Sequence, residues 1–177
     1  GREWRNATYM QLGIKEAEDQ ISAAKYLKTL PYVDGERIAI CGWSYGGYQA
    51  LMCLSLQAKN GDIFKCGIAI APVTNWRLYD SAYTERFMRR PQVNEFGYEG
   101  TDLMKMAKDL TGELLIVHGL ADDNVHAQNT LLYTDALVKA GKQFDMQLYV
   151  DDNHSIRNPE NNEHLHKRIM LFLERNL

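Results

Sequence analysis

Apolar residues recur along the chain in two alternating patterns. From Ile14 to Leu27 they recur at intervals of three and four residues, which predicts an amphipathic helix that ends before Pro31. Short apolar runs predict buried strands over residues 37–41, 65–71 and 114–118, and a partly alternating pattern predicts a further strand over residues 144–150. Further helices are predicted over residues 46–58 and 127–139 and around residues 165–173. Strands that alternate with helices indicate a mostly parallel sheet, so the fold class is α/β.

Residues 72–112 interrupt this alternation with a segment rich in aromatic side chains. A short helix over residues 78–88 is the one element that its pattern predicts. The aromatic residues are Trp76, Tyr79, Tyr83, Phe87, Phe96 and Tyr98. An insert that follows the carboxyl end of a strand is well placed to wall a pocket. No repeat or linker divides the chain, and we therefore expect residues 1–177 to form a single domain.

Composition and charge exclude several kinds of partner. The 177 residues carry a net charge of -3, and their 20 basic and 23 acidic side chains are interspersed, so neither nucleic acid nor an anionic membrane surface is an expected partner. The longest apolar stretches fall far short of the roughly 20 residues of a membrane span. The chain begins without Met and shows no targeting segment, which suggests a mature product or an excised segment and leaves the compartment open.

Neither a metal nor a cofactor is predicted. The three cysteines, Cys41, Cys53 and Cys66, lie outside any metal-binding spacing and are expected to be small buried apolar residues. The carboxylate pairs at 122–123 and 151–152 are better explained as turn or capping residues than as ligands, because no third ligand cluster accompanies them.

The run Gly42-Trp43-Ser44-Tyr45-Gly46-Gly47 lies between a predicted strand and a predicted helix. This context is typical of a nucleophile elbow, in which a tight turn presents a serine at the edge of the sheet. Ser44 is therefore the candidate nucleophile. Gly42 and Gly46 are expected to permit close backbone approach, and the backbone N–H of Tyr45 to stabilise an oxyanion. The alternative is a chance match in a glycine-rich turn.

A nucleophilic serine needs a base and an orienting carboxylate, and in this fold they follow it in the order Asp, His. Asp122 comes shortly after the strand at 114–118, and His154 comes shortly after the strand at 144–150. Asp122 is preferred over Asp123 as the orienting carboxylate, although either could instead cap a helix or a turn. His154 is the candidate base, and the alternative is an ordinary surface histidine. The remaining histidines, His118, His126, His164 and His166, are taken as structural.

Together these residues resemble the catalytic domain of the prolyl oligopeptidase family, and most of all its dipeptidyl peptidase IV branch. The likeness runs from about residue 12 to 173. The motifs that carry it lie at residues 42–48, 64–69, 71–73, 79–81, 83–86 and 118–126. The resemblance implies a serine peptidase with a Ser44–Asp122–His154 triad that removes N-terminal dipeptides with proline or alanine at the second position.

The resemblance also implies the residues that bind the peptide substrate. A pocket for the proline ring would be lined by Tyr45, Val73, Trp76, Tyr79, Tyr83 and Val125. Asn124 would bind a carbonyl group of the substrate. A rigid apolar ring suits a pocket with aromatic walls, although aromatic residues of this kind are as often plain core.

Several features of the family are not present in this sequence. The family's β-propeller, the first strands of its sheet and a tyrosine that completes its oxyanion hole are missing. Asn176 stands where a cysteine would pair with Cys66, so no disulfide is expected. The chain is therefore expected to be a fragment of an exported, periplasmic or cell-surface enzyme and, alone, weak or inactive. The open edge of the strand at 37–41 predicts self-association as a homo-oligomer.

Three other functions fit the same residues. A prolyl tripeptidyl peptidase would share the triad, because the groups that bind the substrate amine lie outside the chain. A carboxylesterase or thioesterase would share it because one triad serves all acyl transfers. A non-catalytic interaction domain on a hydrolase scaffold is disfavoured by the joint presence of Ser44, Asp122 and His154.

Overall fold

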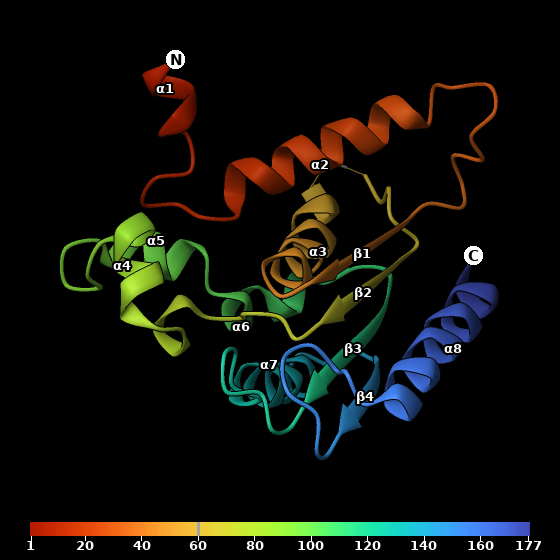
Figure 1. Ribbon diagram of the computed structural model, residues 1–177. Coiled ribbons are helices and arrows are strands. Elements are labelled where there is room, and N and C mark those ends of the chain that lie inside the picture. Colours follow the sequence, from red (N-terminus) through yellow and green to blue (C-terminus); the bar gives the residue numbers. More distant parts are fainter. Residues whose placement is uncertain (60) are drawn as a thin grey trace.

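The computed structural model of the chain describes residues 1–59 and 61–177 and is built around a parallel β-sheet. Within those residues the strands are β1 (Ala39–Trp43), β2 (Cys66–Ile70), β3 (Glu113–Gly119) and β4 (Asp145–Tyr149). They lie in the order β1-β2-β3-β4, and each neighbouring pair is parallel (Figure 1). The predicted α/β class is confirmed.

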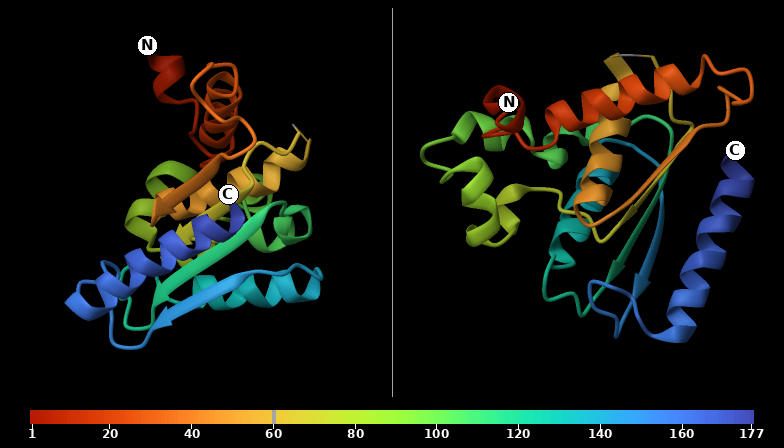
Figure 2. Two further views of the ribbon diagram at one scale, coloured as in Figure 1. Left: turned by 90° about the vertical axis from the view of Figure 1, so that its right-hand side faces the viewer. Right: turned by 45° about the horizontal axis from the view of Figure 1, so that its top comes forward.

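Helices connect the strands and cover both faces of the sheet. The α-helices are α1 (Arg2–Arg5), α2 (Ile14–Leu27), α3 (Tyr45–Leu56), α4 (Ser81–Met88), α5 (Glu95–Gly100), α6 (Leu103–Met106), α7 (Gln128–Lys139) and α8 (Pro159–Asn176). Figure 2 shows α8 on one side of the sheet, with α2, α3 and α7 on the other. The sheet is thus the middle layer of three.

Residues 114–117 of β3 form a continuously apolar run because both faces of the strand are buried. Leu114 and Ile116 belong to the core cluster shared with α2, α3 and α7, whereas Leu115 and Val117 belong to the cluster shared with α8. Successive side chains of a strand point to opposite faces, and here both faces are covered by helices. Each full burial of such a side chain contributes about 1.5–3 kcal/mol to folding.

The first strand differs from its predicted bounds by two residues. β1 begins at Ala39 rather than Arg37, because the N–H of Arg37 donates a hydrogen bond to the carbonyl of Asp34 in the preceding turn. It continues to Trp43, which lies opposite Ile70 of β2. The strand therefore leads directly into Ser44.

The insert between β2 and β3 contains more helix than its sequence pattern predicts. The helix predicted over 78–88 is divided into a short 3₁₀ turn, Trp76–Leu78, and α4, because Asp80 caps α4 by accepting the N–H of Tyr83 at 2.8 Å. The two further helices, α5 and α6, begin at the capping side chains of Asn94 and Asp102. Helices this short owe their stability to caps and packing more than to periodicity.

One of the three cysteines is not buried as predicted. Cys53 and Cys66 are buried, but Cys41 is exposed because β1 lies at the edge of the sheet.

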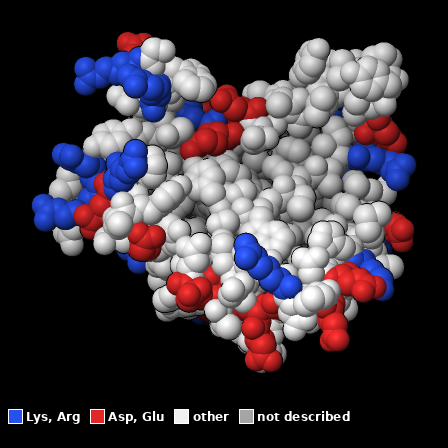
Figure 3. Space-filling view, viewed as in Figure 1, with Lys and Arg blue, Asp and Glu red and all other residues white. Residues whose placement is uncertain are grey.

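Figure 3 shows charged side chains around the rim of the face seen in Figure 1 and a broad area without them in the middle. Among the described residues, none of the helices combines the length and the apolar character that crossing a membrane requires.

Candidate active site

Ser44 lies in a strained turn between β1 and α3. Its backbone has φ 59° and ψ -119°, a conformation that residues other than glycine rarely adopt. The N–H of Ser44 donates to the carbonyl of Ile70 at 2.8 Å, and the carbonyl of Ser44 accepts the N–H of Tyr48 at 3.0 Å. These two bonds hold the turn in place at the carboxyl end of the sheet, where a nucleophile elbow presents its serine.

Two glycines around Ser44 lack room for a side chain. A Cβ at Gly42 would lie 2.0 Å from the carbonyl oxygen of Gly46, and one at Gly47 would lie 2.9 Å from that of Ile70. A Cβ at Gly46 would meet no atom within 4 Å. The expectation is thus confirmed for Gly42 and wrong for Gly46, because the close approach of α3 to β2 falls at Gly47 instead.

Asp122 and His154 come together across the ends of β3 and β4. His154 Nδ1 donates a hydrogen bond of 2.7 Å to Oδ2 of Asp122. The two loops approach closely because Gly119 has no side chain: a Cβ there would lie 2.3 Å from the carbonyl oxygen of Asp152. The N–H of Ala121 donates to that same carbonyl at 3.0 Å. Residues far apart in the sequence are thereby fixed as a pair.

The loop of His154 is also tied to the turn that holds Ser44. The indole Nε1–H of Trp43 donates to the carbonyl of His154 at 2.8 Å. Trp43 is the last residue of β1 and directly precedes Ser44. The structure therefore places all three predicted triad residues at one edge of the sheet.

Asp122 is a buried carboxylate with a full set of hydrogen-bond donors. Its Oδ1 accepts the backbone N–H groups of Asn124 and Val125, each at 2.9 Å, and its Oδ2 accepts from His154. Burial by itself would raise the pKa of Asp122, but the hydrogen bonds from His118, His154 and the N–H of Asn124 outweigh it and lower the pKa well below the usual value. Asp122 is therefore ionised at neutral pH.

His118 touches this carboxylate, a contact that sequence reasoning missed. It is fully buried, and its Nε2 lies 2.8 Å from the carbonyl of Val125 and 3.2 Å from Oδ2 of Asp122. Its Nδ1 lies 2.7 Å from the hydroxyl of Thr130. Since a carbonyl can only accept, Nε2 carries the proton and Nδ1 accepts from Thr130. The position of His118 near the end of β3, shortly before Asp122, was the available signal.

An aromatic cavity opens beside Ser44. Its volume is about 110 Å³, and it is lined by Ser44, Tyr45, Val73, Trp76, Tyr79 and Tyr83. Trp76 contacts two other rings of the cavity wall. Its ring stacks on that of Tyr83, with centroids 6.1 Å apart, and its centroid lies 5.8 Å from that of Tyr45. Burial raises the pKa values of Tyr79 and Tyr83, so both stay neutral.

Val125, which was expected to line this pocket, does not line the cavity, and Asn124, which was expected to bind a substrate carbonyl, lies next to it. The hydroxyl of Tyr79 donates to Oδ1 of Asn124 at 2.8 Å, which brings Asn124 next to the cavity wall. Val125 is fully buried, and its side chain belongs to the core cluster of α2, α3 and α7. Asn124 is exposed, so its amide remains accessible to a ligand.

Half of the aromatic residues of the insert serve other purposes. Phe87 packs against Tyr83 from behind, with ring centroids 4.9 Å apart. Phe96 is 90% exposed, and Tyr98 is buried with its hydroxyl bonded to the carbonyl of Arg89. The expectation that the insert walls a pocket therefore holds for its first three aromatic residues only.

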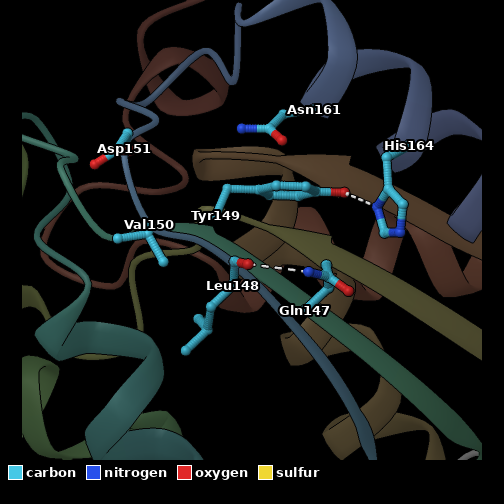
Figure 4. A pocket seen from close by; sticks show the side chains of 7 residues that line it. All are labelled: Gln147, Leu148, Tyr149, Val150, Asp151, Asn161 and His164. Carbon is cyan, nitrogen blue, oxygen red and sulfur yellow. Dashed lines mark hydrogen bonds between the residues drawn. The ribbon is translucent and has the colours of Figure 1, made fainter.

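A second pocket lies between the end of β4 and the first turns of α8. It has a volume of about 380 Å³, and in it the hydroxyl of Tyr149 bonds to Nδ1 of His164 at 2.9 Å (Figure 4). None of the predicted site residues lines it. Over the described part of the chain, we find no group of three or more His, Cys, Asp or Glu side chains that would hold a metal ion.

The parallel sheet flanked by helices is the fold of the α/β-hydrolases. A family model described as the prolyl oligopeptidase family matches residues 1–177. The chain belongs to the prolyl oligopeptidase family, a family of serine peptidases.

Relatives with known structures or curated names agree with this membership. The dipeptidyl peptidase 4 of Porphyromonas gingivalis is 55% identical and superposes on 99% of the chain with a TM-score of 0.94. A putative dipeptidyl aminopeptidase IV of Bacteroides ovatus is 40% identical over 97% of the chain, with a TM-score of 0.90. A probable dipeptidyl-aminopeptidase B of Metarhizium robertsii is 50% identical over 158 residues, or 88% of the chain. The chain spans 24% of each of the two solved chains and 17% of the Metarhizium relative.

Proposed function

We propose that this chain carries the catalytic site of a serine exopeptidase that releases N-terminal dipeptides with proline or alanine at the second position. The hydrogen bond of 2.7 Å between His154 and the buried Asp122, anchored beside the turn that holds Ser44, carries the proposal. The names of the relatives, dipeptidyl peptidase and dipeptidyl aminopeptidase, support the dipeptide specificity.

In this proposal the three residues act as a triad. The Oγ of Ser44 attacks the scissile carbonyl while Nε2 of His154 removes the hydroxyl proton and later transfers it to the leaving amine. Because Nδ1 of His154 donates to ionised Asp122, Nε2 is the nitrogen left free to accept that proton. Water then hydrolyses the acyl-enzyme by the same sequence of steps.

The start of α3 would stabilise the charge that develops during this attack. The backbone N–H of Tyr45 is the first of the helix and lies next to Ser44. Unpaired N–H groups at a helix N-terminus favour negative charge, and one such donor contributes about 2.7–4 kcal/mol to stabilising a transition state. This assigns Tyr45 one donor of an oxyanion hole.

The aromatic cavity would hold the side chain of the second substrate residue. A proline ring is rigid and apolar, and the wall formed by Tyr45, Val73, Trp76, Tyr79 and Tyr83 offers it flat apolar surfaces. A cavity of about 110 Å³ favours small side chains, which suits proline and alanine and excludes large ones. Asn124, bonded to Tyr79 at the margin, would donate to a substrate carbonyl.

A substrate panel on the complete protein tests this proposal. Three chromogenic substrates would be compared by kcat/KM: the nitroanilide of Gly-Pro, the nitroanilide of a tripeptide with proline third, and nitrophenyl acetate as a simple ester. We expect the dipeptidyl anilide to be cleaved best, and its analogue with a blocked amino terminus to be refused. Preferred cleavage of the tripeptidyl anilide or of the ester would replace the proposal with a tripeptidyl peptidase or a carboxylesterase.

We also propose that residues 1–177 form one domain and that this domain alone self-associates through β1. β1 is the outer strand of the sheet in the described residues, and Cys41 at its middle is exposed. An uncovered strand edge pairs readily with another chain, and a lysine on it opposes such pairing. We expect light scattering of residues 1–177 to give a mass that rises with concentration, and Cys41→Lys to hold it at the monomer. A constant monomeric mass of the unsubstituted chain would contradict this.

A further inference from the structure

Tyr45 has two parts that the proposed site uses. Its backbone N–H is the proposed oxyanion donor, and its ring forms a wall of the aromatic cavity, 5.8 Å from the ring of Trp76. The ring is attached through rotatable bonds, so packing and hydrogen bonds must fix its direction. The phenol hydroxyl is the only group of this side chain that can form a hydrogen bond to fix the ring.

That hydroxyl is held by a carboxylate from a different element. The Oη of Tyr45 donates a hydrogen bond of 2.5 Å to Oε1 of Glu16, which lies in the first turn of α2. Burial and this bond together raise the pKa of Tyr45, so the hydroxyl keeps its proton and remains a donor. The bond joins residues 29 positions apart in the chain.

Glu16 is itself held in place. Its second oxygen, Oε2, accepts the backbone N–H of Gly13 at 3.0 Å, and an acidic side chain in the first turn of a helix is favoured by the helix dipole. Gly13 has φ 98°, and a Cβ there would lie 2.4 Å from the ring of Tyr48. Tyr48 in turn donates its hydroxyl to the carbonyl of Leu12 at 2.9 Å. The start of α2 is thus fitted to both tyrosines of α3.

The hydrogen-bond partners of Glu16 differ from those of an acidic residue in a surface ion pair. Among the described residues no Lys, Arg or His forms an ion pair with Glu16, whereas its neighbour Glu18 pairs with Lys15 in an exposed position. Both oxygens of Glu16 accept from neutral donors, and one of these donors belongs to a wall of the cavity. The carboxylate of half-buried Glu16 is therefore bonded to a residue of the candidate active site and forms no surface ion pair.

We propose that Glu16 is a positioning residue for this site: it fixes the ring of Tyr45 and so sets the shape of the cavity next to Ser44. The inference rests on the proposed function and adds a residue to it that does not touch the substrate. Without the carboxylate, the hydroxyl of Tyr45 would lose its acceptor in a largely buried place, and the ring would turn to find another. Binding of a ring in the cavity would weaken, while attack by Ser44 on a reagent that does not fill the cavity would be spared.

The test compares two kinds of ligand in the complete protein. In Glu16→Leu we expect KM for a Gly-Pro anilide to rise about tenfold to a hundredfold, the value of a hydrogen bond to a charged group. Labelling of Ser44 by a small alkyl fluorophosphonate should keep its rate. Glu16→Gln retains an oxygen that accepts from Tyr45 and should restore most of the loss. Glu18→Gln, on the exposed face of the same helix, is the matched control and should leave both readouts unchanged.

Coupling with Tyr45 gives the second readout. Tyr45→Phe removes the same hydrogen bond, so the double variant Glu16→Leu/Tyr45→Phe should be no worse than either single one. Additive losses, or equal losses in KM and in labelling rate, would overturn the inference. If the unsubstituted protein resists the fluorophosphonate, the proposed function fails instead. The coupling is then read from the unfolding free energies of the same four proteins, where additivity overturns the inference as well.

Discussion

Alanine in place of Ser44 is expected to lower kcat for a Gly-Pro anilide by roughly a millionfold, as loss of a nucleophilic serine does in a triad enzyme. The reason is that the acyl-enzyme can form only on the Oγ of Ser44, the side chain presented by the strained turn after β1. Measurement requires the complete protein, its active-site concentration by fluorophosphonate titration, and mass spectrometry to locate the adduct.

Ser22→Ala is the matched control for this change. Ser22 is exposed on α2, where its hydroxyl donates to the carbonyl of Glu18, and its loss should leave kcat unchanged. An adduct on any other residue, or a Ser44→Ala protein with more than about a hundredth of the original activity, would contradict the assignment of Ser44 and revive a non-catalytic role for the scaffold.

The strands of the sheet were predictable because local pattern and buried position agree. β2 and residues 114–117 of β3 are continuously apolar and buried, because helices cover both faces of the sheet there. The start of β1 was predicted two residues too early, because the apolar run begins at Ile38 whereas the backbone of Arg37 still closes a turn with Asp34. Which carbonyl accepts this backbone N–H is decided only in the folded chain, so the apolar pattern alone does not predict where the strand begins.

The elbow and the pair Asp122–His154 were predictable for a different reason. Parallel strands bring their carboxyl ends to one edge, so polar residues that follow successive strands meet there whatever the details of the loops. The contact between Glu16 and Tyr45 has no such rule behind it. Glu16 is one of several acidic residues on an amphipathic helix, and periodicity alone does not separate it from Glu18.

In the insert between β2 and β3, hydrophobic periodicity does not predict the helices. Its helices α5 and α6 have 6 and 4 residues, too few for a period to be visible, and they are fixed by the caps of Asn94 and Asp102. Its aromatic residues are alike in sequence, yet Trp76 lines the cavity and Phe96 is exposed. Which aromatic residue faces Ser44 depends on the path of the chain after β2, and that path is set by these caps.

Asparagine in place of Asp122 is expected to lower kcat by roughly ten thousandfold with little change in KM. An amide would keep an acceptor for the N–H groups of Asn124 and Val125, so the loop should stay folded. Toward His154, however, its NH₂ group would donate, and Nδ1 would have to accept. The ring proton would then move to Nε2, the nitrogen that must receive the proton of Ser44, and the base would be lost without removal of any catalytic side chain.

Asp123→Asn separates this effect from a general change of charge in the loop. Asp123 is the exposed neighbour of the buried Asp122, so its neutralisation removes the same charge from the surface and should leave kcat within about twofold, as surface changes usually cost less than about 0.5 kcal/mol. A large loss in Asp123→Asn with near-normal activity in Asp122→Asn would transfer the orienting role to Asp123. Circular dichroism and thermal unfolding of both variants show whether the loop has kept its fold, and only a folded, inactive Asp122→Asn protein supports the role of this carboxylate in fixing the tautomer of His154.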